Sequence, residues 1–340
     1  MEGKVLSFGE LLLRVGPDAI GRWLSEQRLP FYVGGAELNV ASALALWQIP
    51  TAYFTALPDN SLSRQVAGYV ASLGVDTSHL HYGGERLGLY YLYQGKDLKH
   101  EGVIYDRKYS SFSTLTSEDI DWDALFEGVD WFHFSAISPA LSRATADLCL
   151  EAVKQAHNRR VKVSVDLNYR AQLWAGELKP VDVMPALISY CQVVMGNVWS
   201  LETMLGIPLG TGFAGRMPHE AYLEQAERSS RVLLQRFSNC QAVANTFRFH
   251  QQAGITYYST LLTKDGMEVS GTYKAESAPS KVGSGDCYMA GLIYGLLQRH
   301  APREVVSFAS AAGFTKLFVE SDATNMTVDQ IKMNAAAYEQ

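Results

Sequence analysis

The sequence predicts an α/β protein in which a mostly parallel sheet carries helices on both faces. Between residues 129 and 236, short apolar runs alternate with segments of helical periodicity, which is typical of βαβ units. Before residue 115 the pattern is mixed, because runs rich in tyrosine, leucine and valine are broken by glycines, as in antiparallel strands. At 340 residues the chain is long enough to bury a substantial core.

The first third combines strands with two helices. Residues 3–15 (GKVLSFGELLLRV) predict a strand, a glycine turn and a second apolar strand. Residues 34–49 open with two glycines and continue with helical spacing, and residues 51–60 predict a buried strand that ends in a turn. An amphipathic helix is expected over residues 61–75, and antiparallel strands are expected between residues 86 and 113.

The later part is more regular. Strands are expected within residues 129–137, 161–169 and 191–197, and helices within 142–160, 181–190, 198–206 and 219–236. In parallel sheets of this kind ligands bind beyond the carboxyl ends of the strands. The segments DLNYR, GN and VGSGD would all lie at that edge.

Composition narrows the classes of function. Hydrophobic residues make up 47% and charged residues 19%, and no signal peptide or membrane span is evident, so we expect a cytoplasmic protein. The net charge of -6 without a basic stripe argues against a nucleic acid partner, although a few arginines in one pocket would suffice for a small anion. The four cysteines are dispersed, which argues against a zinc site and predicts a packing role.

The most informative stretch is KVGSGDCYMAGLIYGLLQRH, residues 281–300. A Gly-Ser-Gly turn at the start of a helix offers backbone N–H groups to an anion, and Asp286 could accept a proton from an attacking hydroxyl. The pieces fit a small-molecule kinase. The motif alone is equally compatible with an ordinary helix start that has an acidic first turn. This stretch does not match a Walker A loop, a dinucleotide fingerprint or a nucleophile elbow.

VGSGDCYMAGLIYGLL resembles the G-A-G-D signature of the ribokinase-like (PfkB) carbohydrate kinases, and GGAELNVASALA resembles their N-terminal segment that meets the sugar. Order and spacing agree along essentially the whole chain. The resemblance implies one kinase domain over residues 1–340, built as a three-layer α/β/α sandwich. It also implies a small β-sheet lid inserted from about residues 11–33 and 86–113.

Within that family, GLYYLY, IYDRK and DLNYRAQLW are most similar to the 2-keto-3-deoxygluconate kinases. The resemblance implies a sugar site formed by Gly34, Gly35, Asn39, Tyr90, Tyr105, Arg107 and Arg170. Independently, two arginines suit a substrate carboxylate, because guanidinium groups form charge-assisted and bidentate hydrogen bonds with it. The residues alone leave other interpretations open: surface ion pairs for the arginines, packing for the tyrosines, and a helix cap for Asn39.

For the nucleotide, the resemblance implies ATP with Mg²⁺, with Asn197, Gly283 and Gly285 in the phosphate environment. The sequence departs from the family motif N-x-x-E, because Ser200 stands where a glutamate is expected. Glu202 could contact Mg²⁺ through water instead, or phosphates and water could hold the ion. Ser280 replaces an aspartate that is linked to monovalent-cation activation in some relatives, so we do not predict potassium dependence.

These observations predict ATP-dependent phosphorylation of the 6-hydroxyl of 2-keto-3-deoxygluconate. Asp286 is expected to act as the base, while Gly283, Ser284 and Gly285 offer N–H groups to the transferring phosphoryl. Two alternatives remain: a kinase for fructose, ribose or 2-keto-3-deoxygalactonate, and a non-catalytic sugar-binding regulator on the same scaffold. The exposed lid edge and the resemblance both favour a homo-oligomer, such as a dimer through the lid.

Overall fold

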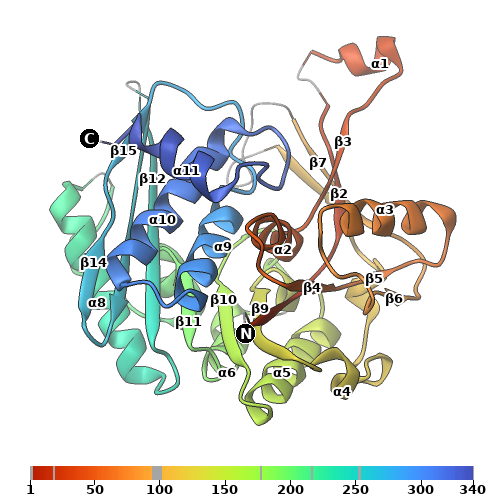
Figure 1. The fold of residues 1–340 in the computed structure, drawn as a ribbon, viewed down its shortest axis with the longest axis horizontal. Helices are drawn as coiled ribbons and strands as arrows, with labels where there is room; N and C mark the ends of the chain where they lie inside the picture. Colours follow the sequence, from red (N-terminus) through yellow and green to blue (C-terminus); the bar gives the residue numbers. More distant parts are fainter. Residues whose placement is uncertain are drawn as a thin grey trace.

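The computed structural model describes residues 3–17, 20–93, 102–176, 178–215, 217–251 and 254–339. Residues 18–19 and 94–101, which fall within the two predicted lid ranges, lie outside this part. The described residues form a main α/β body with a smaller sheet that projects from one edge (Figure 1). The predicted architecture of a mostly parallel sheet, flanking helices and a small β-sheet lid is confirmed.

The main sheet has nine strands among the described residues, and most of them are parallel. Its order is β14-β13-β12-β11-β10-β9-β1-β4, with β15 paired to β13. The parallel strands are β1 (Lys4–Phe8), β4 (Thr51–Phe54), β9 (Val129–Ser135), β10 (Lys162–Asp166), β11 (Val193–Gly196) and β12 (Ala242–Gln251). The antiparallel edge consists of β13 (Gly254–Thr263), β14 (Gly266–Val269) and β15 (Tyr273–Ala275).

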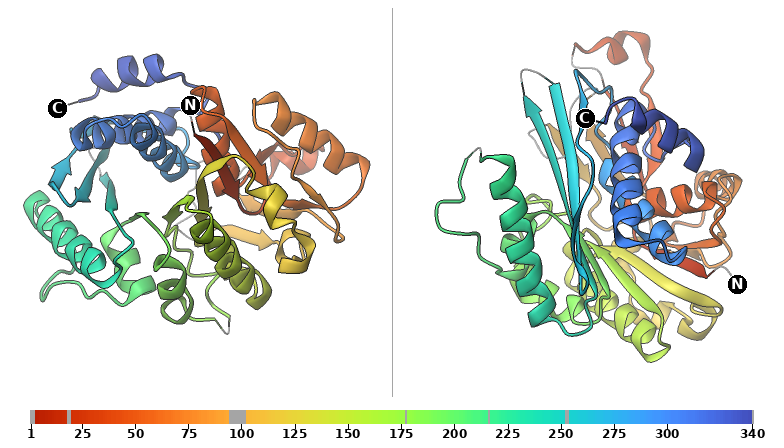
Figure 2. Two further views of the ribbon diagram at one scale, coloured as in Figure 1. Left: turned by 60° about the horizontal axis from the view of Figure 1, so that its bottom comes forward. Right: turned by 60° about the vertical axis from the view of Figure 1, so that its left-hand side comes forward.

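Helices cover both faces of this sheet, as the alternating pattern predicts. One face carries α5 (Arg143–Asn158), α6 (Pro180–Ile188), α7 (Val198–Leu205) and α8 (His219–Arg236). The other face carries α2 (Ala36–Leu46), α9 (Ser284–Leu297), α10 (Pro302–Thr315) and α11 (Val328–Ala336). The right-hand view of Figure 2 shows α8 on one side of the strands and the blue helices α9 and α10 on the other.

The strand sequences explain why two cores form. Successive side chains of a strand point to opposite faces of the sheet. Val194 of β11 therefore packs with α5 to α7, whereas its neighbours Val193 and Met195 pack against the helices of the opposite face. Burial of both faces favours apolar residues at every position of these central strands, which is why they read as continuous apolar runs.

The lid is a separate mixed sheet of order β3-β2-β7-β8. Its strands are β2 (Leu12–Val15), β3 (Phe31–Gly34), β7 (Gly88–Leu92) and β8 (Val103–Asp106), and the short helix α1 (Arg22–Glu26) lies at its tip. The pair β7–β8 is antiparallel as expected, but β2 and β7 run parallel. Beside the lid, α3 (Ser61–Ser72), the short strands β5 (Ala56–Leu57) and β6 (His81–Tyr82), and α4 (Trp122–Leu125) complete the fold.

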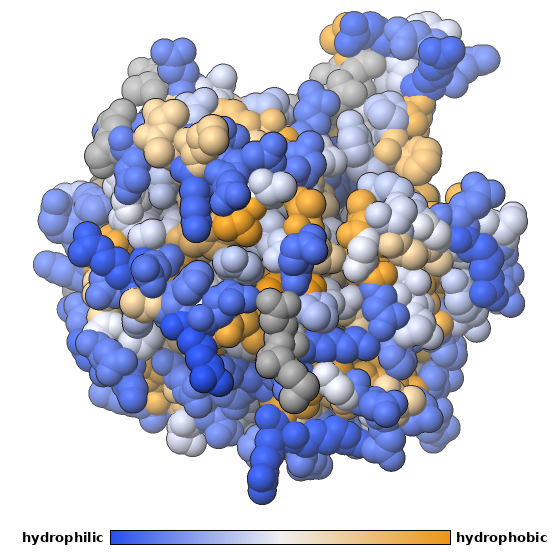
Figure 3. All heavy atoms as spheres, in the orientation of Figure 1, coloured by the Kyte–Doolittle hydropathy of each residue, from blue (hydrophilic) through white to orange (hydrophobic). Residues whose placement is uncertain are grey.

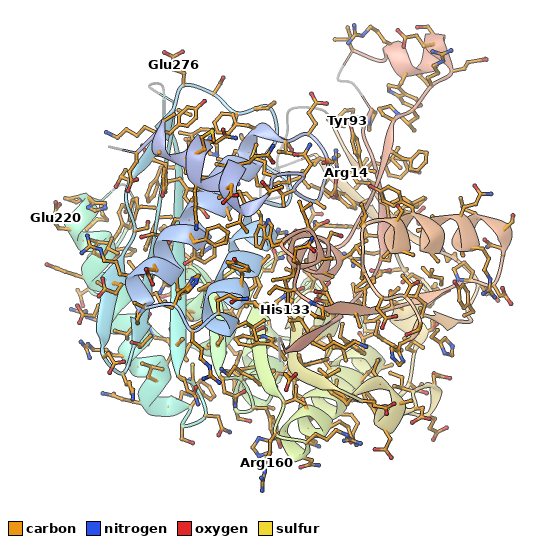
Figure 4. All side chains as sticks on the ribbon, viewed as in Figure 1. Arg14, Tyr93, His133, Arg160, Glu220 and Glu276 are labelled. Atoms are coloured by element: carbon orange, nitrogen blue, oxygen red, sulfur yellow. The ribbon has the colours of Figure 1, made fainter. Side chains whose placement is uncertain are left out.

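One buried histidine belongs to the core and not to a site. His133 of β9 lies at the centre of the main body (Figure 4), and its Nδ1 lies 3.0 Å from Ser164 Oγ, which also accepts the indole N–H of Trp131. Burial lowers the pKa of His133 to about 3, so its ring is neutral at physiological pH. All four cysteines are buried free thiols, in agreement with their predicted packing role.

Candidate active site

A cavity of about 500 Å³ lies where the carboxyl ends of the parallel strands meet the lid. The lid contributes Leu12, Tyr90 and Tyr105, while β10 and β11 contribute Asp166 and Gly196 at their carboxyl ends. The turn before α9 closes a third side. The cavity therefore occupies the place that sheet topology predicts for a ligand.

The start of α9 faces this cavity with unpaired backbone donors. Gly283 caps the helix with φ +74°, and a Cβ at this position would lie 2.0 Å from the Asp322 carbonyl oxygen, so only glycine fits. The first helical bond runs from Cys287 N–H to Gly283, which leaves the N–H groups of Ser284 and Gly285 without a helical acceptor. The Ser284 hydroxyl donates to the Gly313 carbonyl at 2.7 Å, so its side chain faces α10.

Asp286 lies in the first turn of α9 and lines the cavity. Asn39 Nδ2 donates to Asp286 Oδ2 at 2.7 Å. Burial raises the pKa of Asp286 to about 7, with repulsion from Asp166 acting in the same direction, whereas the Asn39 hydrogen bond and the Arg170 charge oppose the rise. A carboxyl group that titrates near neutral pH is suited to accept a proton from a hydroxyl.

The two N-terminal glycines bring lid and main body together. Gly35 caps α2 with φ +146°, and a Cβ there would lie 2.5 Å from the Glu10 carbonyl oxygen. A Cβ on Gly34 would lie 2.4 Å from Asp322 Oδ2. Gly35 lines the cavity but Gly34 does not. Because Gly35 is the cap, Asn39 lies inside the helix, and the alternative in which Asn39 caps it is wrong.

Arg107 lines the cavity, but its charge is already compensated. Its Nε donates to Glu10 Oε2 at 2.7 Å, its Nη2 donates to the same oxygen, and both side chains are buried. The other carboxylate oxygen, Glu10 Oε1, is buried and accepts no hydrogen bond within the described residues. Asn39 Oδ1 is also buried and accepts no hydrogen bond within the described residues. Both residues line the cavity, although these two oxygens are themselves shielded from solvent by neighbouring groups.

A second buried ion pair joins the lid to the C-terminal segment. Arg14 of β2 lies at the junction between the lid and the C-terminal helices (Figure 4), and its Nε and Nη2 both reach Asp322 Oδ1 at 2.7 Å. The Tyr90 hydroxyl donates to Asp322 Oδ2 at 3.3 Å. The rings of Tyr90 and Tyr105 lie 6.3 Å apart. Both tyrosines line the cavity, although the Tyr90 hydroxyl already has an acceptor.

The carboxyl end of β10 contributes one acidic and one basic group. Asp166 is the last residue of the strand and accepts the Asn168 N–H at 3.0 Å through Oδ1. Arg170 donates from Nη1 to the Tyr169 carbonyl at 3.1 Å and forms no ion pair with any carboxylate in the described residues. Arg170 is close enough to Asp286 to oppose the rise in its pKa. It is therefore a cation available to an acidic ligand.

Asn197 caps α7 and also lines the cavity. Its Oδ1 accepts the Ser200 N–H at 2.8 Å, and the Ser200 hydroxyl oxygen accepts the Asn197 N–H at 2.8 Å. Serine in place of the expected glutamate therefore completes a capping box. The Nδ2 amide donor of Asn197 remains available to a ligand. Glu202 lies outside the cavity on the exposed face of α7, where its Oε1 accepts the Leu209 N–H at 3.4 Å.

The residues missed by sequence reasoning are those whose partners lie far away in the chain. Glu10 and Asp166 follow the apolar runs of β1 and β10, and that position at the carboxyl end of a parallel strand could have drawn attention to them. Glu37 is buried and accepts Ser135 N–H at 2.9 Å, and burial raises its pKa. Arg248 and Lys281 line the cavity beside the turn before α9, and Arg248 Nη1 donates to the Lys281 carbonyl at 3.3 Å.

Two broader features bear on the class of protein. No cluster of three or more His, Cys, Asp or Glu side chains suited to a metal ion occurs in the described part of the chain. The helices within the same residues include none with both the length and the apolar character to cross a bilayer.

Comparison with known proteins gives a consistent result. The family model for pfkB family carbohydrate kinases matches residues 3–328. The crystal structure of 2-dehydro-3-deoxygluconokinase from Thermotoga maritima superimposes with a TM-score of 0.87 at 31% identity, covering 98% of this chain and 99% of that one. The 2-dehydro-3-deoxygalactonokinase of Haloferax volcanii is 24% identical, covering 98% of this chain and 96% of its own. The 5-dehydro-2-deoxygluconokinase of Clostridium tetani is 25% identical, covering 91% and 85%.

Proposed function

Because this chain belongs to the pfkB family of carbohydrate kinases, we propose that it phosphorylates the 6-hydroxyl of 2-keto-3-deoxygluconate with ATP. Transfer of a phosphoryl group to a sugar hydroxyl is the established chemistry of the family, whose members use ATP. The choice of sugar acid is the proposal.

One observation carries the proposal: Arg170, which has no carboxylate partner within the described residues, lines the same cavity as Asp286, whose pKa burial raises to about 7. Arg170 can bind a carboxylate through charge-assisted hydrogen bonds. Glu10 and Asn39 line the same cavity with polar side chains of the kind that suit sugar hydroxyls. A substrate with one carboxylate and several hydroxyls matches this set.

The reaction follows from the arrangement at α9. Asp286 accepts the proton of the sugar hydroxyl while the oxygen of that hydroxyl bonds to the γ-phosphorus of ATP. The bond from this phosphorus to the β–γ bridging oxygen breaks at the same time. ADP leaves with the bond electrons, and the proton passes from Asp286 to solvent. The N–H groups of Ser284 and Gly285 stabilise the negative charge of the phosphoryl group at the positive end of the helix.

Mg²⁺ fits this site as an ion carried mainly by the phosphates. Asp166 faces the helix start, since a Cβ on Gly285 would lie 3.9 Å from Asp166 Oδ2. One carboxylate together with phosphate oxygens and water is a common environment for Mg²⁺, which would neutralise phosphate charge. The exposed position of Glu202 does not support a role for that residue in holding the ion.

The galactose-series epimer is the second candidate, favoured by the Haloferax volcanii relative. Both epimers carry the carboxylate, so Arg170 separates acidic sugars from neutral ones. Arg170→Ala should raise KM for either keto-acid by roughly 10- to 100-fold, the loss of one charged hydrogen-bonding partner. The KM of Arg170→Lys should lie between the values of the wild type and of Arg170→Ala, because lysine keeps the positive charge but lacks the planar guanidinium group. Arg231→Ala, on the exposed face of α8, is the control.

The same assay on fructose decides between the two classes of substrate. Because fructose lacks a carboxylate, its kcat/KM should change little in Arg170→Ala. An equal loss for fructose and the keto-acids would contradict recognition of a carboxylate by Arg170.

We also propose that two copies pair through the lid. The outer strands β3 and β8 carry Phe31 at 60% exposure and Ile104 at 55%. Figure 3 shows apolar side chains along the stem of the lid, below the hydrophilic tip formed by α1. Phe31→Asp combined with Ile104→Asp should convert a dimer to a monomer in sedimentation equilibrium, and a wild-type monomer would contradict the pairing.

A further inference from the structure

A fully buried lysine lies behind the phosphate-binding turn. Lys316 follows α10 directly, and 0% of its surface is exposed. Its ammonium donates to the Val282 carbonyl at 2.8 Å and to the Val319 carbonyl at 3.0 Å. No carboxylate lies within ion-pair distance of Lys316 in the part of the chain that the structure describes. Its partners are therefore backbone dipoles.

This lysine supports the turn from which α9 begins. Val282 immediately precedes Gly283, and a Cβ on Gly283 would lie 3.1 Å from Lys316 Cε. The neighbouring Leu317 carbonyl accepts the Ser280 N–H at 3.2 Å, so the residues just before the turn also bond to the segment that follows α10. The turn thus rests on residues 316–322.

The Val282 bond also sets the direction of the next donor. In a trans peptide the C=O and the following N–H point in opposite directions. Because the Val282 carbonyl points toward the Lys316 ammonium, the N–H of Gly283 points away from it. Gly283 lines the cavity, so the lysine orients a donor at the edge of the phosphate site.

Packing alone does not account for a charge in this position. Removing an ammonium from water costs several kcal/mol, whereas methionine would fill a similar volume without that cost. Burial lowers the pKa of Lys316 to about 8, and electrostatic interactions with Cys287, Asp322 and Asp286 oppose the decrease. The group remains mostly protonated at neutral pH.

We propose that Lys316 is a positioning residue for phosphoryl transfer, acting as a built-in cation that fixes the Val282 carbonyl and places positive charge behind the N-terminus of α9. The inference rests on the kinase reaction proposed for this cavity, but not on which sugar is the acceptor. Lys316 touches neither substrate, so its effect passes through the turn.

Lys316→Met tests the need for the charge. Because an indirect electrostatic contribution is weaker than a direct donor, kcat should fall by roughly 10- to 100-fold. The KM for the sugar should stay within about threefold, since the sugar-binding residues come from other elements. The control is Lys162→Met, which changes a half-buried lysine whose Nζ lies 4.9 Å from the Trp131 ring centre. This control should keep wild-type kcat.

Lys316→Ala tests the same idea by chemical rescue. Truncation leaves a small space with two carbonyl oxygens, so ammonium chloride should restore a measurable part of kcat. Tetramethylammonium chloride, whose cation is too large and has no N–H donor, should not. Loss of kcat without rescue, together with an equal loss of sugar affinity and of Tm, would show a merely structural role and overturn the proposal.

Hydrogen exchange gives a readout that does not depend on turnover. Amides in a peptide covering residues 281–290 should exchange faster in Lys316→Met and Lys316→Ala, and ammonium should slow the exchange in Lys316→Ala. Unchanged amide exchange in both variants would refute the role of Lys316 in positioning the turn, even if the wild-type protein phosphorylates none of the sugars tested. An inactive wild type with altered exchange would instead refute only the proposed function.

Discussion

Removal of the Asn39 amide should move the pH dependence of the reaction. Asn39 Nδ2 donates to Asp286 Oδ2 at 2.7 Å, and this bond favours the ionised form of the carboxyl group. Asn39→Ala deletes the donor and should therefore raise the pKa of Asp286 above its wild-type value of about 7.

The size of the effect follows from the hydrogen bond. A bond to a charged group contributes about 1.5 kcal/mol, which corresponds to about one pKa unit. At pH 7 the ionised fraction of Asp286 would fall from about one half to about one tenth, lowering kcat/KM about fivefold. At pH 9 the same shift would lower it by only about one tenth.

The assay is kcat/KM for the sugar acid between pH 5.5 and 9.5, which reports the ionisation of the free enzyme. Ser42→Ala on the same helix is the control, because its hydroxyl donates to the Leu38 carbonyl at 2.8 Å and not to Asp286. Any lost contact between Asn39 and the sugar would scale the whole profile without moving it. An acidic limb that stays at the wild-type pH in Asn39→Ala would refute the reasoning.

Four further predictions follow from the structure. Asp286→Asn should lower kcat by roughly 10²- to 10⁴-fold with little change in sugar affinity by calorimetry; a near-normal kcat would remove the base assignment. It should also raise Tm at pH 8 more than at pH 4. The folded-state pKa of about 7 lies above the unfolded value, so wild-type stability falls as pH rises between the two; a larger gain at pH 4 would contradict this. Arg14→Leu should destabilise the fold in urea by about 3 to 5 kcal/mol because it leaves the buried Asp322 carboxylate without its cation. Arg64→Leu, at the exposed Arg64–Asp59 pair, should cost much less. An equal loss of stability in the two variants would contradict a stabilising role for the buried Arg14–Asp322 pair. The four thiols, whose pKa values burial raises, should react with a thiol reagent only after unfolding, and a rapid reaction in the native protein would show otherwise.

Much of the fold could be predicted because its signals are local. The helix expected over residues 219–236 has those bounds in the structure, since its apolar residues recur with helical spacing. The start of α9 was also predictable, because Gly283 and Asp286 lie within one turn. The parallel pairing of β2 with β7 was not, because strand direction depends on which distant segment a strand meets.

The chemistry of the site was harder to predict for the same reason. The sequence shows Arg107 only as a basic residue in the segment IYDRK, because its partner Glu10 lies 97 residues away. The ion pair of Arg14 with Asp322 spans 308 residues. Lys316 ends a helix, where a lysine is normally taken as solvent-exposed, and only tertiary packing reveals that it is buried.

The most direct test of the account is an analysis of the product. The protein is incubated with Mg-ATP and separately with 2-keto-3-deoxygluconate, its galactose epimer, fructose and ribose, and the mass of the product and the position of its phosphate are determined. We predict preferential phosphorylation of the 6-hydroxyl of the keto-acids, with 2-keto-3-deoxygluconate favoured. Turnover confined to fructose or ribose would contradict the role given to Arg170, and phosphate transfer to none of the four would contradict the proposed function.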